Sequence, residues 1–262
     1  MIIYSSVEEA KIRKAGEIST VILDEMRQNL KIGTLPSEIE RITWDLCKKH
    51  HVIPSFYGVK NGHLSKYRYS TCISVNDEIL HGIPSSKRPF ANGDVVKLDF
   101  GINYKGYNTD HCYTFILGDA SPKDLKLVKT AKLATESALK LAVPGNTTGD
   151  IGSTMFYIAR DNGYDVLKDF VGHGIGTSLH EEPDIPAYGI PGRGDKLVEG
   201  MVICIESQVV TGTDETIIDP NGWTVKSADG EKSAMFEYMV IVRKNKPEIL
   251  TQMSSWPVQI NN

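Results

Sequence analysis

The chain has 262 residues, of which 40% are hydrophobic and 24% are charged, and its formal net charge at pH 7 is −4. This is the composition of an ordinary globular protein, and the mild acidity gives no reason to expect nucleic-acid recognition. No apolar run approaches the roughly 18 residues that suggest a membrane span, and the first residues lack the layout of a signal peptide. The four cysteines are scattered without a CxxC pair, which favours reduced thiols in a cytoplasmic protein.

The chain begins with two amphipathic segments that predict helices. Ser6 and Glu9 have the spacing of a capping box at the start of the first helix. Ser121-Pro122 predicts another helix start, with proline at the first helical position, and that helix is expected to end at Val143-Pro144-Gly145. Helices are therefore expected at about residues 6–30, 37–50, 122–143 and 148–162. The segments between and after them are rich in strand-forming residues.

Asp99 and Asp110 each lie in an apolar strand sequence, and a turn-forming stretch separates them. These sequences predict a hairpin in which Ile102 pairs with Tyr107, so that Asp99 directly faces Asp110. Two facing carboxylates destabilise a sheet unless they share a proton or bind a divalent cation. The local sequence leaves both alternatives open.

The order helix, helix, strands occurs twice along the chain. The sequence from Gly33 aligns without gaps to the sequence from Gly145, and NGDVVKLD aligns to EGMVICIE, which matches Asp99 with Glu206. A later acid, Glu237, lies in the apolar sequence SAMFEYMVIV. These matches predict two related αβ halves about a pseudo-twofold axis, with the carboxylates converging where the two sheets meet.

Three histidines lie in unusual sequence contexts. His173 is flanked by glycines, His180 follows it in the same segment, and His81 precedes a turn. Each of them alone is more readily explained as an imidazole on a surface loop. An imidazole combined with several acids in apolar strands, however, is a suitable ligand set for a pair of divalent metals.

The acids also have a simpler structural explanation. Asp99 shares its strand face with Lys97, so Asp99 alone is better explained as a solvent-facing residue. Glu206 and Glu237 are harder to explain in this way, because their neighbours in the strand are apolar. A buried glutamate without a partner would be neutral or destabilising there.

The motifs around these residues form a set with a fixed order. They are CISVNDEILHGIP, DVVKLDFG, GYNTDHCYTF, GHGIGTSLHEEP, EGMVICIES, NGWTVKSADG and SAMFEYMVIV. Over nearly its whole length the chain resembles the type I methionine aminopeptidases of metallopeptidase family M24, in the short form without an N-terminal extension. The resemblance implies an α+β pita-bread fold, in which pseudo-twofold halves (about 1–120 and 121–250) form a central antiparallel sheet covered by helices. It also implies a single catalytic domain over residues 1–262.

The resemblance further implies a dinuclear metal site. The implied ligands are Asp99, Asp110, His173, Glu206 and Glu237. Asp110 and Glu237 would bridge the two metals, which would be cobalt, manganese, iron or zinc. A hydroxide held between the metals would then attack the first peptide carbonyl of the substrate.

The same resemblance assigns catalytic and substrate-binding residues. His81 would contact the peptide nitrogen, His180 would stabilise the oxyanion, and Glu206 would carry the proton from water to the leaving amine. Cys72 and Trp223 would line an apolar pocket for the methionine side chain.

The implied activity is removal of the initiator methionine from nascent proteins whose second residue is small. Asn76 and Ser233 match positions that help to hold a monovalent cation in some relatives. An enzyme that acts on nascent chains is expected to make a transient ribosome contact. A monomer is the default expectation, and the scattered cysteines and the lack of a long apolar run favour a cytoplasmic protein without a membrane partner.

The chain departs from the family pattern at a few positions. The family usually has proline where this chain has Ser207, often histidine where it has Tyr238, and often phenylalanine where it has Leu179. The stretch 57–71 also differs from the family's usual pocket loop. None of these departures removes an implied metal ligand. The last two, Leu179 and the stretch 57–71, affect the expected pocket shape and therefore the range of substrates. Two rival interpretations remain: an Xaa-Pro aminopeptidase, which would share the ligands, and a metal-free binding module, which would lack some of them.

Overall fold

A computed structural model describes residues 1–60, 66–85 and 87–261 of the chain. Its centre is a sheet with strands in the order β10, β9, β11, β14, β7, β4 and β2. These strands are, respectively, Glu181–Ile185, Gly172–Gly174, Val202–Val210, Ser233–Ile241, His111–Leu117, Val95–Phe100 and Thr71–Val75. Every pair of neighbours in this order is antiparallel, as expected for the central sheet.

Shorter strands extend this sheet or form small sheets beside it. The extending strands are β8 (Asp165–Val166) on β11, β15 (Glu248–Ile249) on β14, and β16 (Gln259–Ile260) on β7. One small sheet contains β1 (Ile53–Pro54), β5 (Ile102–Tyr104) and β6 (Tyr107–Asn108). The other contains β3 (Glu78–Leu80), β12 (Thr216–Ile218) and β13 (Val225–Ser227).

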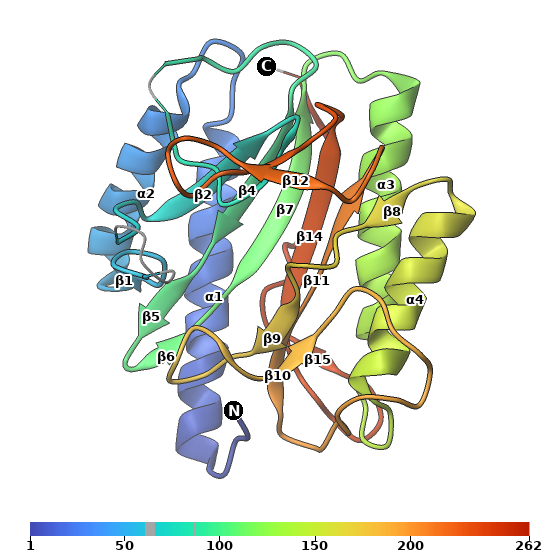
Figure 1. The fold of residues 1–262 in the computed structure, drawn as a ribbon. Coiled ribbons are helices and arrows are strands. Elements are labelled where there is room, and N and C mark those ends of the chain that lie inside the picture. Colours follow the sequence, from blue (N-terminus) through green and yellow to red (C-terminus); the bar gives the residue numbers. More distant parts are fainter. Residues whose placement is uncertain (61–65, 86, 262) are drawn as a thin grey trace.

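The helices of the described chain form two pairs, one for each half of the central sheet (Figure 1). In the first pair, α1 (Ser6–Gln28) contacts α2 (Pro36–His50) and β4. In the second, α3 (Pro122–Leu139) contacts α4 (Thr148–Asp161), β11 and β14. Within the part of the chain that the structure describes, no helix combines the length and the apolar character needed to cross a membrane.

The two halves occupy equivalent places in the central sheet. From the boundary between β7 and β14, the strands β7, β4 and β2 lie on one side and β14, β11 and β9 on the other. The repeat predicted from the sequence matches these elements, because α2 and α4 begin at aligned positions after Gly33 and Gly145, and β4 and β11 also begin at aligned positions. Both glycines have positive φ values, 90° and 99°, which glycine adopts without strain.

The largest hydrophobic cluster lies on the side of the sheet that faces the helices. It includes Leu98 of β4, Ile205 of β11 and Phe236 of β14. Side chains alternate along a strand, so the next residues, Asp99, Glu206 and Glu237, point to the opposite face. Packing of the core thus places three strand acids together on the side of the sheet away from the helices.

Two helix boundaries differ from the prediction. The N-cap of α1 is Ser5 rather than Ser6, because the Ser5 hydroxyl accepts the backbone N–H of Glu8 at 3.2 Å. Helix α3 ends at Leu139, four residues before Val143. After Leu139 the chain tightens into single turns, in which the N–H groups of Leu141 and Ala142 bond to carbonyls three residues earlier and that of Val143 to a carbonyl two residues earlier.

The hairpin that was expected to pair Ile102 with Tyr107 has a different register. Tyr104 pairs with Tyr107 instead, and only two residues form the turn. These two, Lys105 and Gly106, have φ values of 51° and 91°. Two consecutive positive φ values are typical of the tight turns that match the twist of a β-hairpin. The prediction was wrong because it assumed a wider turn.

The new register changes which acids face each other. Asp99 pairs with Cys112, and Asp110 lies between β6 and β7 rather than within a strand. Asp110 is therefore a diagonal neighbour of Asp99 and not its direct partner. The two acids that face each other directly are Glu206 and Glu237, in the pairing of β11 with β14.

Candidate metal centre and pocket

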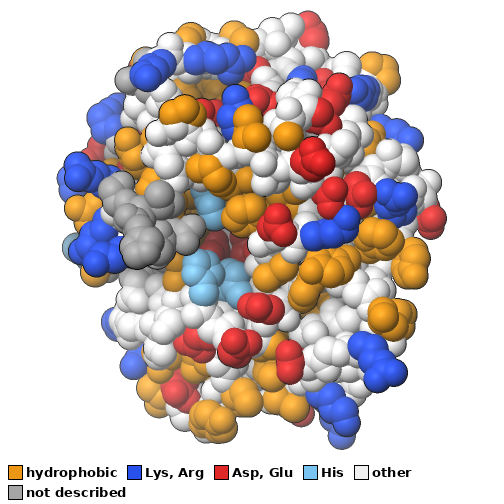
Figure 2. Space-filling model, viewed as in Figure 1, with side chains coloured by type: hydrophobic (Ala, Val, Ile, Leu, Met, Phe, Trp, Pro, Cys, Tyr) orange, Lys and Arg blue, Asp and Glu red, His pale blue; other side chains and the backbone are white. Residues whose placement is uncertain are grey.

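A cavity of about 370 Å³ opens on the face of the sheet that carries the acids. In Figure 2, histidine side chains border a hollow on this face, and acidic atoms are visible inside it. The cavity is lined by all the residues that the resemblance assigned to the metals, to catalysis and to the methionine pocket: Cys72, His81, Asp99, Asp110, His173, His180, Glu206, Trp223 and Glu237. The fold thus gathers residues from both halves of the chain at one place.

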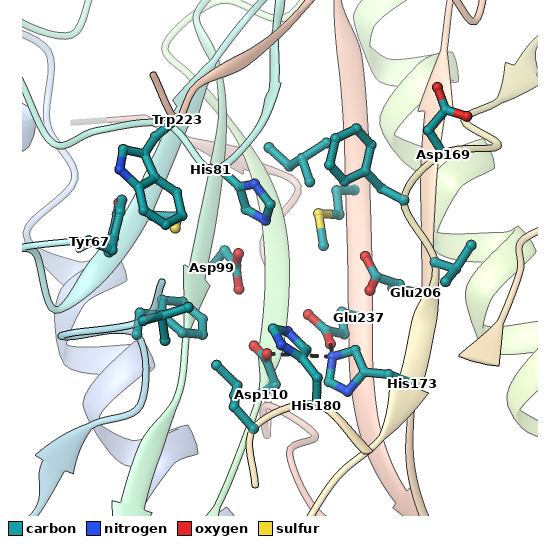
Figure 3. Close-up of a pocket in the computed structure, with 18 of the residues that line it drawn as sticks. Tyr67, His81, Asp99, Asp110, Asp169, His173, His180, Glu206, Trp223 and Glu237 are labelled. Atoms are coloured by element: carbon teal, nitrogen blue, oxygen red, sulfur yellow. Dashed lines mark ion pairs between the residues drawn. The ribbon is translucent and has the colours of Figure 1, made fainter. Parts of the chain in front are cut away.

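Potential metal-ligand atoms lie close together at the floor of this cavity. One carboxylate oxygen each from Asp99, Asp110 and Glu237 lie within 4.8 Å of one another. His173 Nε2 lies 3.8 Å from Asp110 Oδ2 and 3.9 Å from Glu237 Oε1 (Figure 3). The carboxylate of Glu206 lines the same cavity, but among the described residues it belongs to no group of ligand atoms within 4.8 Å of one another.

This arrangement of carboxylates is unfavourable by itself. Asp99, Asp110 and Glu237 each have a buried oxygen without a hydrogen-bond partner among the described residues. Burial raises the pKa of all the carboxyl groups here, to about 7 for Glu206, and neighbouring acids raise the pKa of the other three further. A divalent cation relieves both problems, because it satisfies the free oxygens and offsets the negative charge.

His173 is oriented for binding a metal through one ring nitrogen. Its Nδ1 donates a hydrogen bond to Gly174 O at 2.9 Å, which leaves the lone pair of Nε2 free on the side of the carboxylates. Burial lowers the pKa of His173 to about 3, so the imidazole is neutral. Gly172 allows this close packing, since a Cβ atom there would lie 2.5 Å from Cys204 O. Imidazole with several carboxylates is a donor set that suits manganese, iron, cobalt or zinc.

The other two histidines lie at the sides of the cavity (Figure 3). His81 follows β3 with a positive φ of 53°, and its ring makes an edge contact with Phe170 at a centroid distance of 5.7 Å. Burial, and to a lesser extent His180, lower the pKa of His81 to about 4. The exposed His180 ring lies 4.5 Å from the ring of His173. Both imidazoles thus border the space above the acids.

The wall of the cavity away from His173 is apolar (Figure 3). Phe56, Tyr67, Cys72 and Trp223 form one buried cluster, against which Leu179 packs. The rings of Tyr67 and Trp223 make an edge contact at 5.1 Å. Cys72 and Trp223 were assigned to this pocket from the resemblance. Tyr67 belongs to the atypical stretch 57–71, of which residues 61–65 lie outside the described residues.

Sequence reasoning missed several residues of the site. Tyr67, Phe56 and Phe170 are aromatic residues in loops, and nothing in their local sequence connects them with the acids. Gln208 donates a hydrogen bond from Nε2 to Glu206 Oε2 and so holds that carboxylate. Its position two residues after Glu206, on the same strand face, was the signal that could have identified it.

Asn76 and Ser233 are not among the described residues that line the cavity. Their oxygen atoms converge elsewhere, between the turn that follows β2 and the start of β14. There they accept hydrogen bonds from the Nζ of Lys97, a residue that the sequence analysis considered only as a neighbour of Asp99.

Known proteins resemble the chain in both sequence and structure. The family model of metallopeptidase family M24 matches residues 10–244. The methionine aminopeptidase of Clostridium acetobutylicum is 39% identical over 251 residues, which cover 96% of this chain and 98% of that protein. The crystal structure of the methionine aminopeptidase from Thermotoga maritima has a TM-score of 0.91 at 36% identity and covers 96% of this chain and 100% of that one. The prolidase from Pyrococcus furiosus is more distant, with a TM-score of 0.76 at 25% identity, covering 97% of this chain and 66% of that one.

The chain therefore belongs to metallopeptidase family M24 and has the pita-bread fold that the sequence predicted. Within that family it belongs to the methionine aminopeptidases, which match it over nearly its whole length. The expectation of a metal-dependent hydrolase is thereby confirmed at the level of the family.

Proposed function

We propose that this chain removes the initiator methionine from nascent polypeptides whose second residue is small. The observation that carries the proposal is the cavity itself, with acids and His173 at its floor, two histidines at its sides and an apolar wall. A peptide that begins with methionine could place its side chain against the apolar wall and its first carbonyl above the acids.

Asp99, Asp110, His173, Glu206 and Glu237 are the proposed ligands of two divalent metals, with Asp110 and Glu237 shared between them. The unpartnered oxygens and raised pKa values of these acids support this assignment. Metals bound there would polarise the scissile carbonyl and make water a stronger nucleophile. Because the donors are hard oxygens and imidazole, cobalt, manganese, iron and zinc are all compatible with the site.

The chain's own side chains would orient the peptide and move the proton. His81 is proposed to contact the peptide nitrogen, and its low pKa keeps the ring neutral above about pH 5. His180 is proposed to donate to the carbonyl oxygen as negative charge develops on it. Glu206 is proposed to pass the proton from water to the leaving amine, while Gln208 holds its carboxylate in place.

The apolar wall is the proposed methionine pocket. A thioether makes favourable contacts with aromatic rings, and Tyr67 and Trp223 present such rings beside Cys72. A tight cavity also favours a small residue at the second position of the substrate.

The proposed setting is the cytoplasm, where nascent chains begin with methionine and a transient contact with the ribosome would bring the enzyme to them. The buried free thiols of Cys47, Cys72, Cys112 and Cys204 support a reducing compartment. We propose that the enzyme acts there as a monomer of one catalytic domain.

The test is hydrolysis of Met-X-Ser peptides with X varied, by protein reconstituted with each metal in turn. Rapid release of methionine is expected for X = Gly, Ala or Ser and little release for X = Leu or Lys. Ala-Pro-Ala serves as the control for Xaa-Pro specificity and should remain intact. Preferential cleavage of Ala-Pro-Ala would replace this proposal with the rival one.

A further inference from the structure

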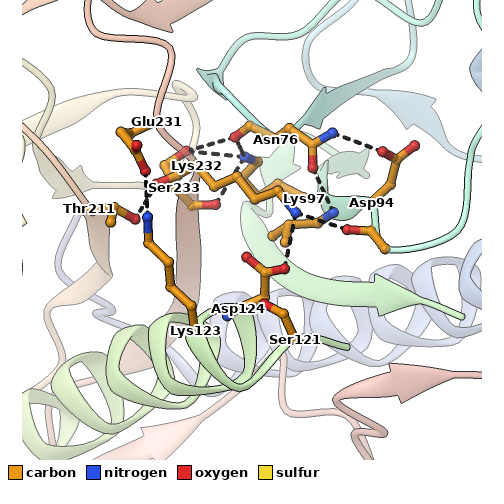
Figure 4. A network of polar contacts seen from close by, with 12 residues as sticks. Asn76, Asp94, Lys97, Ser121, Lys123, Asp124, Thr211, Glu231, Lys232 and Ser233 are labelled. Carbon is orange, nitrogen blue, oxygen red and sulfur yellow. Dashed lines mark hydrogen bonds and ion pairs between the residues drawn. The ribbon is translucent and has the colours of Figure 1, made fainter. Parts of the chain in front are cut away.

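Lys97 is a buried lysine whose hydrogen-bond partners among the described residues are neutral oxygen atoms. Its side chain extends from β4 and is 1% exposed. Its Nζ donates to Asn76 O at 2.9 Å, to Ser233 O at 3.1 Å and to Ser233 Oγ at 3.1 Å (Figure 4). Three acceptors around one Nζ favour the ammonium form, because only that form has three N–H donors.

Converging carbonyl and hydroxyl oxygens are also the ligands that sodium and potassium ions select in proteins. An ammonium group that donates to these same oxygens leaves no room for such an ion. The expectation of a monovalent cation at Asn76 and Ser233 therefore does not fit the residues present, since Lys97 already supplies one positive charge at that point.

The position of Lys97 gives the contact a structural role. Lys97 lies two residues before Asp99 in β4, and Ser233 begins β14, which carries Glu237. These strands are not neighbours, because β7 lies between them. The Asn76 side chain extends the network, since its Nδ2 donates to Asp94 Oδ1 at 2.8 Å and its Oδ1 accepts the Val95 N–H at 3.0 Å.

We propose that the Lys97 side chain is a built-in replacement for a monovalent cation, which ties β4 to β14 and makes the fold independent of sodium and potassium. The inference concerns a site separate from the catalytic cavity and does not depend on the proposed activity. It makes Lys97 a positioning residue for the strands that carry Asp99 and Glu237.

The test compares melting temperatures of the metal-free protein in potassium, sodium and choline chloride at equal ionic strength. Choline is too large to enter the site. The wild-type protein is expected to melt at the same temperature in all three salts. Lys97→Ser leaves the same oxygens around an open space that a potassium or sodium ion could fill. This variant should therefore melt at least about 2–4 °C lower in choline than in potassium or sodium. A shift of this size is typical of one lost interaction in a chain of this length.

Two control variants separate ion binding from general destabilisation. Lys97→Met fills the space with an uncharged chain, so its melting temperature should fall equally in all three salts. Lys232→Ser removes a nearby lysine that bonds Gly93 O and Asp124 Oδ2, and it should show no preference among the salts. If Lys97→Ser does not fold in choline, its refolding yields in potassium and choline provide the same comparison.

The proposal would be overturned if potassium or sodium, relative to choline, raised the melting temperature of the wild type by more than that of Lys232→Ser. A Lys97→Ser variant that responds to all three salts alike would also overturn it, because its oxygens would then not form a cation site.

Discussion

At the residue scale, the site depends on hydrogen bonds that fix which atom of a side chain faces the cavity. The Nδ1 bond of His173 to Gly174 O directs Nε2 toward the acids. Gln208 holds one oxygen of Glu206 in the same way. His81 reaches the cavity because its backbone has a positive φ directly after β3, a conformation that few residues other than glycine adopt.

The lowered pKa of His81 has a measurable effect on stability. Its pKa is about 4 in the folded chain, against about 6.5 for an ordinary histidine, so between these pH values only the unfolded chain binds the proton. This contribution to stability is present above pH 6.5 and is lost as the pH falls toward 4. In metal-free protein, the free energy of unfolding of the wild type relative to His81→Gln should therefore decrease over that range, as measured by urea unfolding. A difference that stays constant from pH 7 to pH 4 would show that His81 is not held in its neutral form.

At the scale of elements, the pairing of β11 with β14 combines a strong apolar match with an electrostatic conflict. All residues of both strands are buried, and pairs such as Ile205 with Tyr238 are well suited to a sheet. Glu206 and Glu237, however, face each other in the middle of this pairing. Like charges directly opposite each other destabilise a sheet, so this pairing carries a local electrostatic penalty that divalent metals bound at the proposed site would remove.

This conflict predicts an unusual effect of removing an acid. Glu237→Gln should raise the free energy of unfolding of the metal-free protein at neutral pH by about 1–3 kcal/mol, because a buried carboxyl group with a raised pKa is replaced by a neutral amide. The same variant should lose most of the increase in melting temperature that divalent metals give the wild type.

The matched control is Asp45→Asn. Asp45 is an exposed acid of α2, and its Oδ2 lies 3.5 Å from Nη1 of Arg41. This change should alter stability by no more than about 0.5 kcal/mol and leave the response to metals intact. A Glu237→Gln variant that is less stable than wild type without metals would contradict the account of the β11 and β14 pair.

At the scale of the whole molecule, the sequence predicted what depends on local pattern and on repetition. The helices lie within a few residues of their expected positions, and the aligned repeat corresponds to equivalent helices and strands. The hairpin register was wrong, because the conformations of Lys105 and Gly106 decide it and several turns fit the same residues. The contact between Lys97 and Ser233 was missed because 136 residues separate the two, and only the assembled sheet brings them together.

The central claim is that the two halves gather five side chains to hold divalent metals on which peptide hydrolysis depends. The most direct test measures metal content and Met-Ala-Ser hydrolysis on the same samples of chelator-treated and reconstituted protein, for wild type and for His173→Ala. Wild type is expected to bind two metal equivalents and to be active only when reconstituted, whereas His173→Ala should lose most of both, a fall of roughly 10- to 100-fold or more. Full activity in the chelator-treated wild type, or unchanged metal content in His173→Ala, would contradict the account.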